Sequence, residues 1–208
     1  MKIDSIPFRK ILVYLVYILL IPSVQVILMP RVSLLGQIAD LMLVFVVLSG
    51  FMYGFVDGIV VGLAVGLVRD LFASPVIPGP GNTLSISIGL GMFVMFFAGV
   101  YGSVFFEGRT NRNFPLGILA VLTFTLIYKL TGNLAVYAWE SFIAEMKSTP
   151  DIAMILRDSV LISALLNCVS SIPLYFLLRY LGPVRWNRKL KENNKELTYG
   201  DSGKWLTI

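Results

Sequence analysis

Few side chains in this sequence are suited to catalysis or to metal binding. The 208 residues include no histidine and a single cysteine, Cys168. A serine or cysteine nucleophile needs a neighbouring base, and a zinc site needs several thiolate or imidazole ligands. The glycine-rich segment 79–82 is followed by Thr83, not by the Lys-Ser/Thr pair of a phosphate-binding loop. The sequence therefore predicts a protein that is not an enzyme and that uses neither a cofactor nor a metal ion.

A pair of membrane aspartates is the remaining alternative for catalysis. Asp40 and Asp70 are the two carboxylates that such a pair would use. Neither lies near the centre of its predicted helix, and Arg69 adjoins one of them. A catalytic assignment needs acid and base groups placed together in a pocket, and the sequence gives no sign of one. We therefore favour a structural role for both residues.

Charged residues inside the apolar stretches form a pattern. Charges in lipid are costly unless they pair, reach the headgroups or face a cavity. Lys129 lies about ten residues, roughly 15 Å, from the outer end of its predicted helix, so it needs a partner or a wet cavity. Asp158 and Asp40 have a suitable depth. We predict a structural ion-pair cluster, with a substrate site as the alternative. The outer-side polar cluster comprises Asp40, Arg69, Asp70, Lys129, Arg157 and Asp158.

Three other residues stand outside this cluster. Asn167 lies deep in the last predicted helix, where an amide most often bonds to a neighbouring helix, so we predict an intramembrane polar clamp. Cys168 has apolar neighbours, which are typical of a packed thiol. Asp57 is a charged residue near the opposite, inner end of its helix.

The elements that must position these residues are membrane helices. The chain is 57% hydrophobic and 14% charged, whereas a soluble domain has about 25% charged residues. Its apolar runs predict a polytopic, all-α bundle of six transmembrane helices, residues 1–183, followed by a flexible basic cytoplasmic tail, residues 184–208. The predicted helices are 11–29, 36–51, 56–72, 84–106, 114–139 and 152–181, with a loop at 74–82.

The distribution of basic residues predicts the orientation. Lysine and arginine concentrate at both chain ends and in the loop 107–113. By the positive-inside rule, both termini are cytoplasmic. The same distribution argues that the net charge of +5 serves orientation in a membrane, so we expect the lipid bilayer and not nucleic acid as a partner.

Glycines recur at every fourth position of the third predicted helix. A four-residue step advances a helix by about 400°, so the recurring glycines lie near one face. Small residues at this spacing let a neighbouring helix approach closely in lipid. We predict a helix-packing or partner interface and favour packing within the chain, because this helix follows a tight hairpin. Its members are Gly54, Gly58, Gly62 and Gly66.

Three segments carry a resemblance to a known family. In the segment 39–43 an acidic residue enters an apolar helix, and in 66–71 a glycine-rich helix ends in Gly-Leu-Val-Arg-Asp-Leu before a Pro/Gly loop. The segment 167–179 adds an asparagine, a proline and a final Leu-Leu-Arg. Together these features resemble the rod shape-determining MreD family over most of residues 8–183.

The resemblance implies a non-enzymatic, multi-pass protein of the bacterial inner (cytoplasmic) membrane. It implies membership of the cell-elongation machinery, with the single-span protein MreC as a partner and a link to the actin-like MreB filament. Such a protein helps maintain rod shape by supporting peptidoglycan synthesis along the side wall. The family also resembles, in its fold, the substrate-binding membrane subunits of energy-coupling-factor vitamin transporters. Such a subunit is the alternative function, with a pocket on the outer side.

Overall fold

The computed structural model is a helical bundle, as predicted from the sequence, with one small β-hairpin. It describes residues 8–72, 76–78, 84–86, 89–104, 113–142 and 160–183, and only the backbone at 76–78, 84–86 and 136–142. Its elements are α1 (Phe8–Ile27), the 3-10 helix η1 (Met29–Arg31), α2 (Leu41–Tyr53), α3 (Phe55–Phe72), β1 (Val76–Pro78), β2 (Leu84–Ile86), α4 (Leu90–Val104), α5 (Phe114–Phe142) and α7 (Ile162–Leu181).

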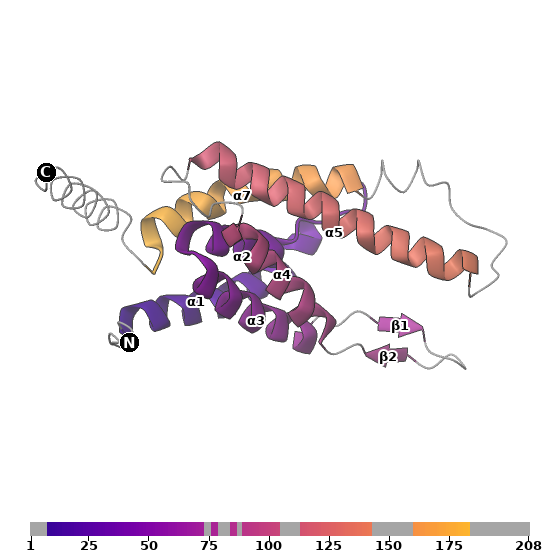
Figure 1. Ribbon diagram of the computed structural model, residues 1–208, viewed down its shortest axis with the longest axis horizontal. Coiled ribbons are helices and arrows are strands. Elements are labelled where there is room, and N and C mark those ends of the chain that lie inside the picture. Colours follow the sequence, from indigo (N-terminus) through magenta and orange to yellow (C-terminus); the bar gives the residue numbers. More distant parts are fainter. Residues whose placement is uncertain are drawn as a thin grey trace, which may run out of the picture.

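Successive helices run in opposite directions along the bundle, so the bundle has two distinct ends (Figure 1). At one end, here called the hairpin end, lie the two strands, the last turn of α1 and the first turn of α2. At the other, here called the terminal end, α1 begins, α2 meets α3 and α7 finishes (Figure 1). The first and last described helices therefore start and finish on the same side of the bundle.

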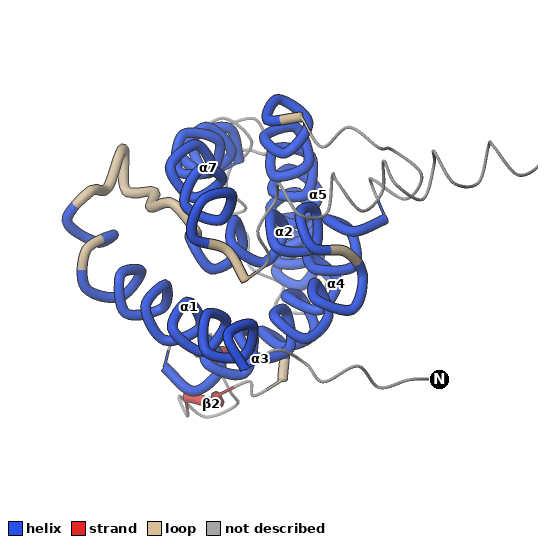
Figure 2. The backbone as a smooth tube through the Cα atoms, turned by 90° about the vertical axis from the view of Figure 1, so that its left-hand side faces the viewer, coloured by secondary structure: helices blue, strands red, loops and turns tan. Residues whose placement is uncertain are grey.

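Helix α2 is the centre of the fold. Its residues from Met42 to Tyr53 are all buried, and the view along the bundle shows the other helices arranged around it (Figure 2). It has 13 residues, or about 20 Å at 1.5 Å per residue, whereas the hydrocarbon core of a bilayer is about 30 Å thick. Backbone groups at its ends therefore need partners within the protein, because lipid offers none.

Helix α4 packs on α2 and α3 through direct contact of the backbones. A Cβ atom on Gly58 would collide with the carbonyl oxygen of Gly99, and one on Gly99 would collide with that of Gly58. Gly50 of α2 meets the same Gly99 carbonyl. Any larger residue at these positions would push the helices apart, so the glycines set the spacing of the three-helix unit α2–α3–α4.

The remaining helices pack around this unit with side chains. Tyr53, the last residue of α2, donates a hydrogen bond of 2.6 Å to the carbonyl of Leu178 on α7. Helix α1 is peripheral, since only Tyr17, Ile21 and Pro22 of its residues are buried. The bundle thus has a tightly packed half and a more loosely attached outer helix.

The second predicted helix begins later than the sequence suggested. Its start was predicted at residue 36, but α2 begins at Leu41. Leu35 and Gly36 have positive φ angles of 50° and 77°, which a right-handed helix cannot contain. Leu34 and Gln37 bridge across this turn. The chain therefore reverses here before the helix starts.

The fourth helix also differs from its predicted bounds. The fourth was predicted from residue 84, but α4 begins at Leu90, because residues 84–86 pair antiparallel with 76–78 in a small hairpin. The strand 76–78 lies within the predicted loop 74–82. For the sixth, the predicted start 152–159 lies outside the described residues.

Not every helix is long enough to cross a bilayer alone. Among the described residues, three segments have the required length and apolar composition, Phe8–Arg31, Phe114–Ala135 and Ile162–Leu181. Helices α2 and α4 are apolar but shorter. The structure therefore has the character of a membrane protein whose shortest described α-helix, α2, lies at its centre.

Candidate functional site

The start of α2 is a half-buried polar position built around Asp40. One oxygen of its carboxylate, Oδ1, accepts a hydrogen bond of 3.1 Å from the backbone N–H of Leu43. The other, Oδ2, forms an ion pair of 2.9 Å with Nη1 of Arg69, near the end of α3. A carboxylate here caps the helix and complements the positive end of its dipole. The guanidinium of Arg69 also lies beside Tyr128, which connects the site to α5.

Asn167 joins α7 to the same position. Its side chain is 1% exposed, and its Oδ1 accepts a hydrogen bond of 2.7 Å from the backbone N–H of Asp40. Its Nδ2 donates to the hydroxyl of Thr125 on α5 at 3.2 Å. One buried amide therefore bonds to two other elements, and this is the geometry of an interhelical clamp.

Gln25 of α1 completes the cap from the other side. Its Oε1 accepts from the backbone N–H of Leu41 at 2.7 Å, and its Nε2 donates to the carbonyl of Ala39 at 2.9 Å. The backbone donors at the start of α2 thus have side-chain acceptors from α1, from α7 and from the cap residue itself. We call this group the α2 cap cluster; it consists of Gln25, Asp40, Arg69, Thr125 and Asn167.

Asp70 performs a similar task for α4. Asp70 is only 2% exposed. Its carboxylate accepts hydrogen bonds from the backbone N–H groups of Gly89, Gly91 and Met92, at 2.8, 2.8 and 3.1 Å. A Cβ atom on Gly91 would collide with Oδ1 of Asp70. Gly89 has a φ of 104°, which favours glycine. The acidic end of α3 therefore caps the start of α4.

The hydrogen bonds of Asp40, Asn167, Gln25 and Asp70 satisfy backbone groups at the starts of α2 and α4. An unsatisfied backbone group in lipid costs several kcal/mol, so each acceptor has a large structural value. Asp40 and Asp70 serve different helix ends, which is not the arrangement of a catalytic pair sharing one proton. Among the residues that the structure describes, no group of three or more histidine, cysteine or acidic side chains is placed to bind a metal ion.

The other members predicted for the outer-side polar cluster are placed differently. Lys129 is half-buried on α5 and forms no ion pair with any described residue. Asp40, one of its two candidate partners, pairs with Arg69 instead. Arg157 and Asp158 lie outside the described residues, so a Lys129–Asp158 pair stays a prediction.

The glycines of the predicted stripe do not all lie in one contact. Gly58, Gly62 and Gly66 face the backbone of α4, where added Cβ atoms would meet Gly99, Met95 and Met92, respectively. Gly54 instead ends α2 with a φ of 99°, and a Cβ atom added there would have no neighbour within 4 Å. Three of the four residues are therefore a packing surface within the chain, and Gly54 makes the turn into α3.

Several residues that matter were not found from the sequence. Spacing along one helix identified the α3 glycines, but not Gly91, Gly99 and Gly102 of α4, whose intervals of eight and three are irregular. Gln25 and Thr125 are polar residues within apolar helices, and this feature of the sequence could have identified them. Lys10 counted only as one of the basic residues at the N-terminal end of the chain, yet it forms a 2.6 Å ion pair with Asp57 at the terminal end.

Comparison with known proteins adds no relative. No protein family, no curated protein and no solved structure matches the chain.

Proposed function

We propose that the chain is a non-enzymatic, inner-membrane component of the bacterial cell-elongation machinery, which maintains rod shape by supporting side-wall peptidoglycan synthesis. The observation that supports this most is the use of Asp40 and Asp70. These acidic residues carry the resemblance to the MreD family, and both cap the start of a helix. Their use for architecture fits a scaffold better than a protein that acts on a substrate.

In this proposal the bundle is a rigid platform for an MreC-like single-span protein and other elongation proteins. A platform needs fixed helix positions, and the backbone contacts of Gly58 and Gly99 supply them. Both termini are cytoplasmic, which agrees with the first and last described helices starting and finishing at the terminal end (Figure 1).

The alternative is the substrate-binding membrane subunit of an energy-coupling-factor type vitamin transporter. One observation favours it: Asp40, Arg69 and Asn167 gather at the hairpin end, which this orientation places outside the cell. Against it, these three side chains bond to one another or to backbone groups. A substrate would have to displace those bonds.

Depletion of the protein from its host distinguishes the two functions. The proposal predicts that rod-shaped cells become round and wide, that uptake of vitamins stays normal, and that a plasmid copy restores the rods. A tagged copy should also co-purify with the MreC-like protein. Normal rods combined with a new vitamin requirement would favour the transporter subunit.

Cysteine labelling in intact cells tests the orientation. After Cys168→Ala, single cysteines at Ser5 or Thr207 should be protected from an impermeant thiol reagent, and single cysteines at Asn82 or Ser148 should react. Reaction at Thr207 without reaction at Asn82 would invert the proposed orientation.

A further inference from the structure

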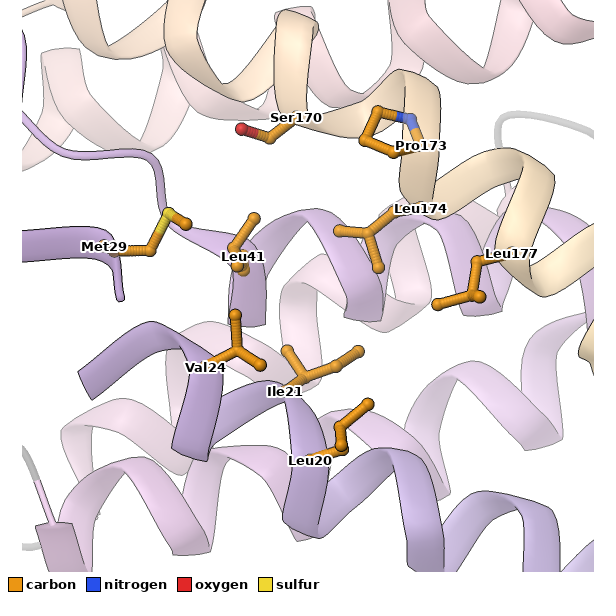
Figure 3. A pocket seen from close by; sticks show the side chains of 9 residues that line it. All are labelled: Leu20, Ile21, Val24, Met29, Leu41, Ser170, Pro173, Leu174 and Leu177. Atoms are coloured by element: carbon orange, nitrogen blue, oxygen red, sulfur yellow. The ribbon is translucent and has the colours of Figure 1, made fainter. Parts of the chain in front are cut away.

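A cavity of about 340 Å³ lies between α1 and α7, and Leu41 of α2 also lines it (Figure 3). Leu20, Ile21 and Val24 line it from α1, and Pro173, Leu174 and Leu177 line it from α7. Ser170 is the one polar residue among the nine that line it. We propose that this groove holds one acyl chain of a membrane phospholipid.

The groove exists because α1 and α7 are joined at few points. The described hydrogen bonds between them run from the hydroxyl of Tyr17 to the carbonyls of Leu177 and Leu181, both at 3.5 Å. Each helix also contains a proline, Pro22 or Pro173, which removes a backbone donor and disfavours a straight helix. The two helices therefore diverge over Leu41, the first residue of α2.

The size of the groove limits which molecule can bind in it. Tyr17 bridges the helices on the terminal side, and Met29 of η1 lines the groove on the hairpin side. From Leu20 to Met29 the chain rises about 14 Å at 1.5 Å per residue, whereas a membrane-spanning helix is about 30 Å long and at least 10 Å wide. A cavity of about 340 Å³ is far too small for such a helix, and it suits a single flexible chain.

The charge beside the groove supports a phospholipid. Arg31 follows the lining residue Met29 by two positions, is exposed, and has no ion pair among the described residues. A guanidinium binds phosphate oxygens well and remains charged. With the chain between α1 and α7, the phosphate of the same lipid lies within the reach of this arginine at the hairpin end.

Native mass spectrometry of the full chain tests the proposal. Protein reconstituted with palmitoyl-oleoyl phosphatidylglycerol and released into mild detergent should retain one lipid. Ser170→Phe places a ring in the groove and should reduce the retained fraction at least tenfold. Val169→Phe is the matched control, because Val169 is 56% exposed on the same helix and does not line the groove.

A second pair of variants covers the possibility that Ser170→Phe fails to fold. Leu20→Phe should reduce retention in the same way, whereas Leu19→Phe should not; these residues are 50% and 60% exposed, and only Leu20 lines the groove. Arg31→Gln should lower the retained fraction severalfold. Equal retention in the groove and control variants would overturn the proposal. So would a co-purifying polypeptide, lost only from the groove variants, in place of the lipid.

Discussion

The α3–α4 contact and the α1–α7 groove are two helix pairs of one bundle, built in opposite ways. Between α3 and α4 the backbones touch at Gly58 and Gly99, with no side chain between them. Between α1 and α7 bulky aliphatic side chains line a cavity, and the described hydrogen bonds come from Tyr17 alone. Since apolar side chains gain nothing by leaving lipid, only the first arrangement gives a strong contact in a membrane.

The difference assigns separate tasks to the two regions. The unit α2–α3–α4 contains the caps formed by Asp40 and Asp70, so its helix ends and its spacing are both fixed. Helix α1 buries only three of its residues; Tyr17 and Ile21 pack in the core, and Gln25 and Lys10 add polar contacts to α2 and α3. We therefore expect substitutions in the first region to affect the stability of the whole bundle, and substitutions at α1 to have local effects.

The largest effect is expected from bulk in the α3–α4 contact. Gly62→Leu would drive a side chain into the backbone of Met95, and overpacking costs about 1–3 kcal/mol even where side chains can move aside. We expect Gly62→Leu to lose stability at or above the upper end of this range. The loss should appear as a smaller fraction of folded protein after a temperature ramp in detergent. Gly132→Leu on α5 is the control, since a Cβ atom there has nothing within 4 Å.

The same variant separates internal packing from partner docking. If α3 used Gly62 to bind a partner, Gly62→Leu would persist at the normal level in membranes and fail only to co-purify with that partner. Normal stability together with normal partner binding would show that the close contact with α4 is unimportant.

The next effect concerns the cap of α4. Asp70→Ala removes the acceptor of three backbone donors, and each buried unsatisfied group costs about 1–3 kcal/mol unless water reaches it. We expect a loss of about 2–4 kcal/mol in the free energy of unfolding. Asp70→Asn keeps one oxygen and should lose less. Equal losses for the two variants would mean that the capping bonds contribute little.

A smaller effect is expected on the α7 side of the comparison. Asn167→Leu leaves the N–H of Asp40 without its acceptor, at a cost of about 1–3 kcal/mol. Unfolding in a denaturing detergent series should show this loss. Cys168→Leu, on the next residue and half-exposed, is the control. A loss no greater than that of the control would show that the clamp is dispensable.

The sequence predicts those features that depend on one helix at a time. Apolar runs predicted the six helices, and spacing placed Gly58, Gly62 and Gly66 on one face. The sequence of one helix does not show which other helix packs against it. The pairing of Asp40 with Arg69, and not with Lys129, depends on helix rotations, and the interaction of Asp70 with Gly91 depends on how α4 packs on α3. The hairpin 76–86 was missed because its prolines and glycines are equally typical of an irregular loop.

The smallest effect is expected where α1 meets α3 at the terminal end. Lys10 is 2.6 Å from Oδ1 of Asp57, and its ammonium lies 5.9 Å from the centre of the Tyr14 ring. The side chain of Lys10 is 26% exposed, and partly exposed ion pairs contribute about 0–1 kcal/mol. Lys10→Gln should therefore cost less than about 1 kcal/mol, and Lys10→Gln with Asp57→Asn should recover part of that loss. Because salt screens such a pair, the difference from wild type should shrink in 0.5 M salt, about five times the ionic strength at which the Debye length is about 10 Å. The effect of Gly62→Leu is steric and should not change with salt. A salt-independent loss for Lys10→Gln as large as that of Gly62→Leu would mean that α1 belongs to the rigid unit, and the contrast between the two regions would fail.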